Sequence, residues 1–404
     1  MKAWKVGGAV RDALLGRASG DTDWVVTGAT PEQMVAAGYT PVGRDFPVFL
    51  HPTTKEEYAL ARTERSTAPG YHGFVFHAAP TVTLEEDLQR RDLTINAMAQ
   101  DDHGALIDPC GGQRDLAARL LRHVSPAFIE DPVRILRVAR FAARLGDFSV
   151  APETATLMRE MVASGEVDAL VAERVWQEVA RGLMEAHPSR LLDVLHDCGA
   201  LARLLPEIDA DWSAGRAAPA HETLPSPAPS PLPLPPPTTP TLRHAIDTTA
   251  CRHAPLPVRL AVLAHRMPLA ALHALCERWR IPTDCRELAE LLVRERDAVQ
   301  RSPTLGADAL VDLLDRCDAW RRPERFEWLL QSCDGIAHAT PAAGTDAPSQ
   351  SRLRAALKRA AALDTGAVAQ RAAVAGARGP DIGAAVHTAR VLAVEDELSD
   401  EVND

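Results

Sequence analysis

The alternation of apolar and polar positions divides the chain into a mixed first part and a helical remainder. Up to about residue 123, short β-like runs are separated by Gly, Pro and Asp. Thr30 and Pro31 are typical of a helix N-cap and first turn, and Gly38 would end that helix. The predicted strands are Trp4–Val6, Asp23–Val26, Val48–His51 and Glu57–Ala61.

From about Pro126 the apolar residues recur every three or four positions, which predicts helices. This pattern continues to about Pro206 and returns after an interruption. The segments that carry it most clearly are Ile135–Leu145, Trp176–Met184, Arg190–Leu195, His244–Glu295, Leu305–Asp334 and a helix from about Arg352.

Two segments interrupt the helical pattern. Pro219–Pro240 contains ten prolines in 22 residues, with Ser and Thr between them, which favours a disordered linker or surface loop inserted between helices. A recognition segment for a proline-binding module is the alternative. Ala337–Gln350 is rich in Ala, Pro and Ser and is predicted to be a second loop.

Composition excludes several classes of protein. Of the 404 residues, 46% are apolar and 25% charged, as in ordinary globular proteins. No apolar run approaches the length of a membrane helix, and the N-terminus lacks an apolar signal core, so we expect neither membrane insertion nor secretion. The seven cysteines are scattered without a Cys-x-x-Cys pair, which argues against a disulfide framework, a disulfide-linked partner and a thiolate zinc site. We therefore expect a cytoplasmic protein.

Charge is distributed unevenly along the chain. The net charge is −11, and Val394–Asp404 contains six acidic residues and no basic one. By contrast, Arg134–Arg144 contains four arginines and no acidic residue. Bulk acidity is therefore compatible with a local phosphate-binding site.

The densest chemical signal lies between Gly7 and Asp23. Gly7 and Gly8, between a strand and a helix, let the backbone approach a phosphate closely, and Arg11 adds a charged fork. Asp21 and Asp23 are two residues apart in a β-like run and supply the hard oxygen ligands that Mg²⁺ prefers. Taken alone, the Gly7–Gly8 pair also fits a tight turn, and the Asp21 and Asp23 pair also fits a solvated turn. Within 17 residues, in strand–turn–helix–strand order, they indicate metal-dependent chemistry on a nucleoside triphosphate.

Two further clusters are rich in arginine. Arg90 and Arg91 precede an expected amphipathic helix that begins near Leu93. Asp131 and Arg134 lie one turn apart at the start of another helix, with Pro132 between them. The alternatives are solvated arginines on a capped helix and an exposed ion pair, respectively.

These segments resemble the bacterial class II CCA-adding enzymes, tRNA nucleotidyltransferases of the polymerase β superfamily. The similarity covers most of residues 1–210. It rests on Val6–Gly16, Asp21–Val25, Gly43–His51, Glu57–Arg65, Arg90–Ala99, Leu121–Phe128 and Glu130–Arg144.

The resemblance implies an α/β nucleotidyltransferase head with a mixed, mainly antiparallel sheet, followed by an all-α neck, body and tail. Asp21 and Asp23 would be the catalytic residues and would hold Mg²⁺. A flexible loop that assists ATP addition would lie within Thr63–His77. The residues implied to bind CTP and ATP are Gly8, Arg11, Arg91, Asp131, Arg134, Arg137 and Arg140.

The family selects bases with side chains, and Asp131 and Arg134 match those positions. A carboxylate accepts a hydrogen bond from the exocyclic amine of cytosine or adenine, while a guanidinium donates to ring acceptors. Uracil and guanine would place a carbonyl oxygen against the carboxylate, at a cost of about 1–3 kcal/mol. The implied activity is the addition of C, C and A to the tRNA 3′ end from CTP and ATP, with release of pyrophosphate.

Some relatives carry a C-terminal phosphohydrolase domain built around an adjacent His-Asp pair. In the corresponding region of this chain, His265 is followed by Arg266, so the resemblance implies a degenerate HD-like region without metal chemistry. The implied divisions are a catalytic head at 1–125, a neck for nucleotide selection and RNA binding at 126–210, an insert at 211–243 and a body and tail at 244–404.

Two other functions stay open. A bacterial poly(A) polymerase would share the head, but the acidic tail differs from the large basic extension of that class. A non-catalytic tRNA-binding protein would not need the Asp21 and Asp23 pair.

Overall fold

The computed structural model describes residues 1–18, 20, 22–42, 48–66, 74–214, 241–337 and 348–403. Contacts within the chain are concentrated in two units, Met1–Ser213 and Ala214–Asp404. The predicted insert at Pro219–Pro240 lies outside the described residues, as do 338–347 of the second predicted loop and 67–73 of the loop expected to assist ATP addition.

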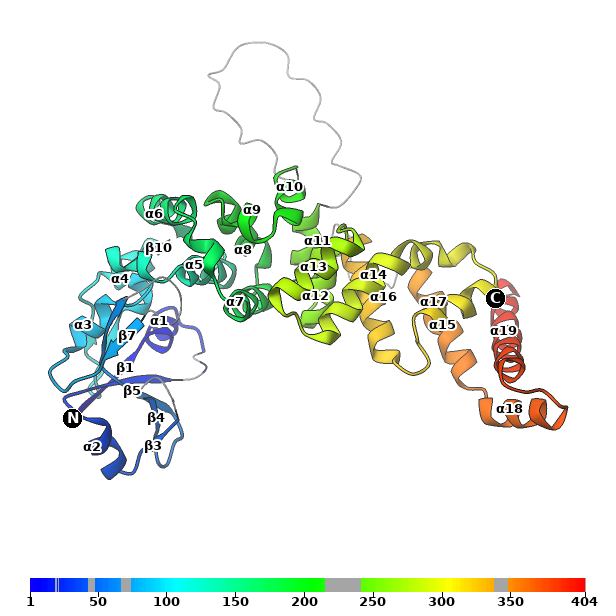
Figure 1. The fold of residues 1–404 in the computed structure, drawn as a ribbon, viewed down its shortest axis with the longest axis horizontal. Coiled ribbons are helices and arrows are strands. Elements are labelled where there is room, and N and C mark those ends of the chain that lie inside the picture. Colours follow the sequence, from blue (N-terminus) through cyan, green and yellow to red (C-terminus); the bar gives the residue numbers. More distant parts are fainter. Residues whose placement is uncertain are drawn as a thin grey trace, which may run out of the picture. The chain divides into compact units, whose positions relative to one another are not determined.

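A β-sheet forms the head of the first unit (Figure 1). It has seven strands in the order β3-β4-β5-β2-β1-β8-β9. β2 and β5 pair in parallel, and the other described pairs are antiparallel. This mixed, mainly antiparallel sheet confirms the expected fold class. Its strands are β1 (Lys2–Val6), β2 (Asp23–Thr27), β3 (Thr40–Pro41), β4 (Val48–Leu50), β5 (Glu57–Leu60), β8 (Ala99–Gln100) and β9 (Leu106–Ile107).

The central strands are apolar on both faces. Val25 and Val26 are neighbours on β2 and point to opposite faces of the sheet, where each joins a different buried cluster. The first cluster contains Leu88 and the second contains Met34, so helices cover both faces. The helices of the head are α1 (Gly8–Leu14), α2 (Pro31–Ala36), α3 (Leu84–Gln89) and α4 (Gly112–Ala117).

The first unit also contains two small sheets. β6 (Thr63–Ser66) pairs antiparallel with β7 (Phe74–His77), and β10 (Leu120–Leu121) pairs in parallel with β11 (Ser149–Val150). The two ends of the loop expected to assist ATP addition therefore form a pair of antiparallel strands.

The prediction of a helix that begins near Leu93 is wrong. The segment forms only the single 3₁₀ turn η2 (Thr94–Asn96) before β8. Ile95, Ala97 and Met98 are all buried, so the segment has no solvent-facing side on which a helix could expose polar residues. Its polar groups bond to distant partners instead: the Thr94 amide donates to the Arg122 carbonyl oxygen, and such partners cannot be identified from the local pattern.

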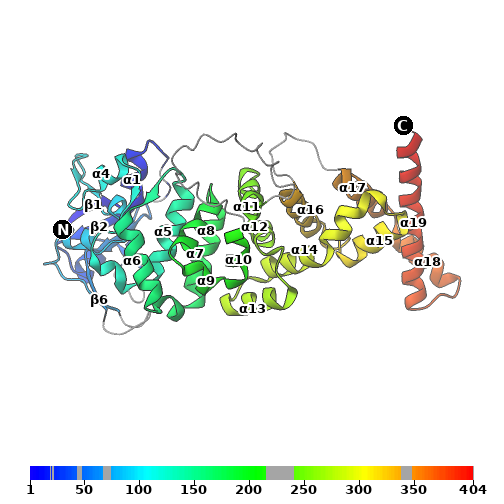
Figure 2. The same cartoon turned by 90° about the horizontal axis from the view of Figure 1, so that it is seen from above.

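The rest of the first unit is helical, as expected. α5 packs against α7 and α8 (Figure 2). Pro206 begins a helix rather than ending the helical region, because a proline fits the first turn. The elements are η3 (Pro126–Glu130), α5 (Val133–Arg144), α6 (Pro152–Ala163), η4 (Glu166–Ala169), α7 (Ala172–Met184), α8 (Pro188–Asp197), α9 (Ala200–Leu204) and α10 (Pro206–Ala214).

The described part of the second unit is helical throughout. α12 is its most buried helix and packs against α11, α14 and α16. None of the helices searched in the described ranges is both long and apolar enough to cross a membrane. The elements are α11 (Leu242–Cys251), α12 (Leu256–Ala264), α13 (Leu269–Trp279), α14 (Thr283–Arg301), η5 (Ser302–Thr304), α15 (Ala307–Arg316), α16 (Pro323–Ala337), α17 (Pro348–Ala361), α18 (Thr365–Val374) and α19 (Pro380–Asn403).

Candidate active site

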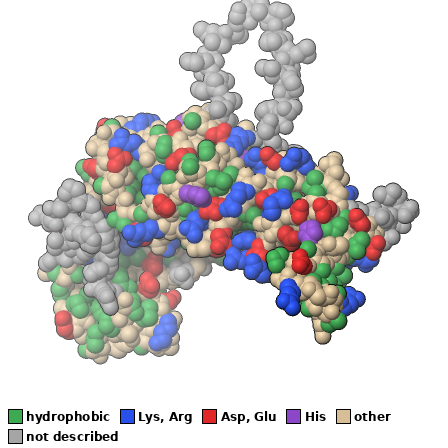
Figure 3. All heavy atoms as spheres, turned by 45° about the vertical axis from the view of Figure 1, so that its right-hand side comes forward, with side chains coloured by type: hydrophobic (Ala, Val, Ile, Leu, Met, Phe, Trp, Pro, Cys, Tyr) green, Lys and Arg blue, Asp and Glu red, His purple; other side chains and the backbone are tan. Residues whose placement is uncertain are grey.

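The first unit contains a strongly basic hollow of about 470 Å³. Nine arginines and three aspartates line it, so its wall has an excess of positive charge. On the face shown in Figure 3, Lys and Arg side chains are interspersed with Asp and Glu. The lining residues are Gly7, Gly8, Arg11, Asp23, Arg62, Arg90, Arg91, Asp92, Asn96, Asp131, Arg134, Arg137, Arg140, Phe141, Arg144 and Arg174.

The strand–turn–helix corner at Gly7 forms one wall of the hollow. Gly7 has φ 68°, and a Cβ atom there would lie 3.0 Å from Nη1 of Arg91, so glycine suits both the backbone and the space. Asp23 is the antiparallel partner of Val6, and its exposed carboxylate therefore begins β2 beside the glycines. Asp21 lies outside the described residues.

Arg11 is buried beneath this corner, with an exposed fraction of 2%. Its Nη1 donates to Oδ1 of Asn96 at 2.6 Å, and its Nε donates to Oδ1 of Asp12 at 2.8 Å. Burial lowers the pKa of Arg11, while Asp12 opposes that change. Arg144 donates to the other oxygen of Asp12 at 2.7 Å. The guanidinium of Arg11 is thus fixed in position at the wall of the hollow.

Asp92 connects the head to α5. Its Oδ2 accepts from Nε of Arg137 at 2.8 Å, and its Oδ1 accepts from the Leu93 amide at 2.8 Å and from Nδ2 of Asn96 at 3.1 Å. Burial by itself would raise the pKa of Asp92, but Arg137 and these donors hold that pKa well below its ordinary value. The carboxylate is therefore ionised at neutral pH and orients Arg137.

A second buried carboxylate orients the arginines of α5 from the opposite side. Glu178 on α7 lies 2.8 Å from Nε of Arg140 and 3.7 Å from Nη1 of Arg137. Burial lowers the pKa of Arg140, and Glu178 opposes that change. In the head, the buried Asp87 pairs with Arg90 at 2.9 Å and with Arg91 at 3.2 Å. Buried carboxylates therefore hold these arginines in position.

Asp131 is bound from α7 as well. Nη1 and Nη2 of Arg174 donate to its two oxygens at 3.2 and 2.8 Å. Arg134 is buried, and its Nη1 and Nη2 donate to the carbonyl oxygens of Ala127 and Arg90 at 3.0 and 2.9 Å. Both side chains expected to read the base therefore have fixed orientations.

The hollow brings together eight of the nine expected site residues, and the ninth is Asp21. Sequence reasoning did not assign site roles to Arg62, Asp92, Asn96, Arg144 and Arg174, which also line it. Asp92 and Asn96 lie in the Arg90–Ala99 motif, so their proximity to Arg91 was a usable signal. Arg174 is 43 residues from Asp131, and its local sequence contains no sign of that pairing.

The chain matches known proteins along almost its whole length. A Poly A polymerase head domain family matches residues 3–122, and a family described as the probable RNA and SrmB-binding site of polymerase A matches 147–211. The multifunctional CCA protein of Leptothrix cholodnii is 56% identical over 414 residues, covering 98% of this chain and 96% of that protein.

Solved structures share the fold. The Bacillus stearothermophilus CCA-adding enzyme in complex with CTP superposes with a TM-score of 0.70 at 24% identity, over 98% of this chain and 89% of that one. The Thermotoga maritima CCA-adding enzyme in complex with tRNA gives a TM-score of 0.56 at 20% identity, over 89% of this chain and 86% of that one.

Proposed function

Because this chain belongs to the family of bacterial CCA-adding tRNA nucleotidyltransferases, we propose that the basic hollow of the first unit is its active site. The enzyme adds C, C and A to the tRNA 3′ end from CTP and ATP and releases pyrophosphate. The observation that carries the proposal is the convergence of nine arginines, the Gly7–Gly8 corner and Asp23 on one hollow. Such a wall fits a triphosphate, and the aspartates provide for metal binding and base selection.

Enzymes of this family generally use a divalent metal ion, and we propose that here it is Mg²⁺ held by Asp21 and Asp23. The fit to this chain is supported by Asp23, whose exposed carboxylate is a hard oxygen donor in a wall with an excess of arginines. When bound, the metal would lower the pKa of the tRNA 3′-hydroxyl and neutralise charge on the triphosphate.

The residues around that carboxylate would bind the triphosphate. Gly8 at the start of α1 lets the backbone approach the phosphates, and Arg11 is held beneath by Asn96 and Asp12. Arg91, Arg137 and Arg140 would contact the phosphates or the ribose. Because Asp87, Asp92 and Glu178 already hold these arginines, little side-chain entropy would be lost on nucleotide binding.

Base selection would occur at Asp131 and Arg134. Arg174 donates to both carboxylate oxygens of Asp131 from α7, so the carboxylate is kept in one plane. Two N–H groups of Arg134 are bonded to backbone carbonyls, which fixes the plane of the guanidinium. A fixed acceptor beside a fixed donor matches cytosine and adenine and leaves uracil and guanine mismatched.

The other regions would serve the tRNA. We propose that residues 1–125 form the catalytic head, that 126–210 select the nucleotide and bind RNA, that 211–243 form an insert, and that 244–404 form a body and tail. Binding of tRNA would weaken with salt, because counterions are released when phosphates are neutralised. The enzyme would act in the cytoplasm, where tRNA is matured.

The experiment that tests this function is extension of a tRNA that ends at its discriminator nucleotide, with CTP, ATP or both. The expected products are two nucleotides longer with CTP and three longer with both. Long runs of AMP from ATP alone would instead identify a poly(A) polymerase. No extension by the wild-type chain would overturn the catalytic assignment.

A further inference from the structure

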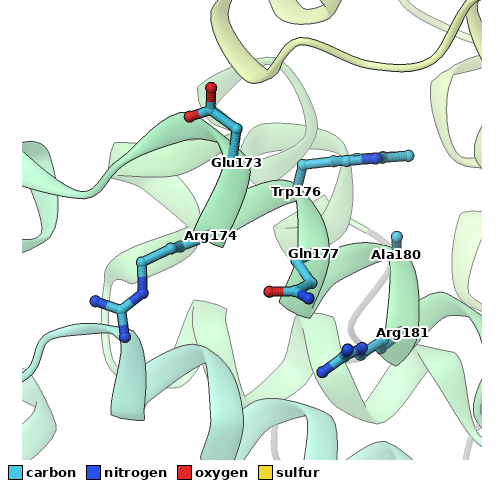
Figure 4. A pocket seen from close by; sticks show the side chains of 6 residues that line it. All are labelled: Glu173, Arg174, Trp176, Gln177, Ala180 and Arg181. Atoms are coloured by element: carbon cyan, nitrogen blue, oxygen red, sulfur yellow. The ribbon is translucent and has the colours of Figure 1, made fainter. Parts of the chain in front are cut away.

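A second hollow lies on α7, beside the one that we assign to the nucleotide. Its described lining comes from α7 alone: Glu173, Arg174, Trp176, Gln177, Ala180 and Arg181 (Figure 4). Arg174 also lines the basic hollow, so the two hollows adjoin at the side chain that holds Asp131.

The periodicity of α7 sorts these residues into two neighbouring rows. Arg174, Gln177 and Arg181 are spaced i, i+3, i+7 and form a polar row with two positive charges. Glu173, Trp176 and Ala180 have the same spacing and form the adjacent row, in which Trp176 supplies the large apolar surface. Figure 4 shows Trp176 and Ala180 projecting from one side of the helix, while Arg174 points away from them.

Two of these side chains are available to a ligand. Arg181 is exposed and Trp176 is half-buried. Within the described ranges, neither the Arg181 guanidinium nor the Trp176 indole makes a hydrogen bond. Arg181 lies three residues after Glu178 on α7, and Glu178 pairs with Arg140 in the basic hollow, so Arg181 is near the nucleotide site. A basic row beside an exposed aromatic ring suits single-stranded nucleic acid, in which phosphates and bases follow parallel paths.

We propose that this face of α7 binds the unpaired 3′-terminal nucleotides of the tRNA, with a base stacked on Trp176 and a phosphate at Arg181. The proposal rests on the function proposed above. Under the proposed function the incoming base would lie against Asp131, whose partner Arg174 lines both hollows, so a primer nucleotide stacked on that base would have the α7 hollow beside it. From Arg174 to Arg181 the helix is about 10 Å long, enough for about three stacked nucleotides.

The test compares two RNA hairpins that mimic the acceptor stem, one with an unpaired 3′ nucleotide and one blunt-ended. With the full-length protein, we expect Trp176→Ala to weaken binding of the overhanging hairpin about tenfold and to leave the blunt hairpin unchanged. Trp176→Phe keeps an aromatic face and should retain most of the affinity. Arg181→Ala should lower the salt slope by about 0.7, the value for one single-strand phosphate contact.

Two controls separate this inference from the proposed function. CTP affinity without RNA should stay unchanged in both alanine variants. Arg114→Ala removes an exposed arginine from α4, which contributes no described residue to either hollow, and should leave both hairpins bound as in the wild type. Unchanged binding of the overhanging hairpin, or an equal loss for both hairpins, would overturn the proposal and indicate a packing surface or a protein-binding surface. Failure of the wild-type chain to extend tRNA would overturn the proposed function instead.

Discussion

Asp131 shows how a side chain acquires its environment from a distant part of the chain. The sequence predicts that Asp131 lies one turn from Arg134. In the structure, both carboxylate oxygens of Asp131 accept hydrogen bonds from Arg174 on α7. Asp92 is similar, because Arg137 from α5 holds it ionised against the cost of its burial. At this scale, charge pairs set the orientation of the groups that would meet the nucleotide.

Asp23 is expected to be essential. Asp23→Ala removes a hard oxygen ligand beside the glycine corner, and we expect transfer of both CMP and AMP to fall by at least about a hundredfold. Primer extension under single-turnover conditions measures this. CTP affinity in the absence of metal serves as the control and should change little, because the arginines remain. Full activity would contradict the metal assignment.

Base choice is expected to depend on Asp131 and on its partner. Asp131→Ala should raise incorporation of UMP and GMP relative to CMP and AMP by about tenfold, since the mismatched carbonyl no longer faces a carboxylate. Arg174→Ala should give a weaker form of the same effect. Competition assays with paired nucleotides measure the ratio, and Arg159→Ala on α6 is a charge-matched control. Unchanged rejection of UTP and GTP would remove Asp131 from the selection role.

Among the elements, close packing of short segments positions the site. The 3₁₀ turn η2 lies against the start of α4, where a Cβ atom on Gly112 would be 2.3 Å from the carbonyl oxygen of Thr94. The same turn contains Asn96, which bonds to Arg11. The packing of α4 on η2 therefore determines where Arg11 is held.

Gly112→Ala is expected to destabilise the first unit. The clash is with backbone and with Met98, neither of which can move far in a buried segment, so we expect a loss of about 1–3 kcal/mol of unfolding free energy. Urea unfolding followed by circular dichroism measures it. Gly306→Ala is the matched control, because a Cβ atom there meets nothing within 4 Å. Equal stability of the two variants would contradict the packing argument.

The contact between α19 and α15 is expected to depend on pH. Nδ1 of His387 lies 3.1 Å from Asp315, and Nε2 lies 3.4 Å from Asp308 and 3.8 Å from Asp312. The hydrogen bond with Asp315 raises the pKa of His387. Arg390, also on α19, pairs with Asp315 at 3.2 Å. The stabilisation from the imidazolium is therefore full below its ordinary pKa of about 6.5 and is lost as pH rises through the raised pKa.

Hydrogen exchange of α19, corrected for the intrinsic rate, measures this effect. As pH rises from about 6.5 through the raised pKa of His387, we expect the protection of α19 to fall about two- to fivefold, the change that an exposed ion pair produces. His387→Gln should remove the pH dependence while leaving the Arg390 contact in place. The same pH dependence in this variant would assign it to another group.

For the whole molecule, the second unit is expected to lack phosphohydrolase activity. His265 follows the last residue of α12, is buried, and is followed by Arg266 rather than an aspartate. In the described part of the chain, no three His, Cys, Asp or Glu side chains converge as metal ligands would. We expect no hydrolysis of 2′,3′-cyclic nucleotides with Ni²⁺ or Co²⁺, measured beside a relative that keeps the His-Asp pair. Measurable metal-dependent hydrolysis would contradict this.

The local sequence was sufficient to predict the elements whose cause is local. Three such elements are present: the strand–Gly-Gly–helix corner, the Thr30 cap and the helix α5 with apolar residues at every third or fourth position. Each depends on neighbours a few residues away. The extended motifs also identified the family. The segment after Leu93 was mispredicted because its polar groups bond to partners in α4 and to the Arg122 backbone.

The tertiary structure alone decided how the site is assembled. It joins the Gly7 corner, η2, α5 and α7. Gly7 and Arg174, which both line the hollow, are 167 residues apart in the sequence. The pairing of Arg174 with Asp131 and that of Glu178 with Arg137 and Arg140 follow from the packing of α7 on α5. A helix's own period shows which residues share a face, but only packing selects the element that this face meets.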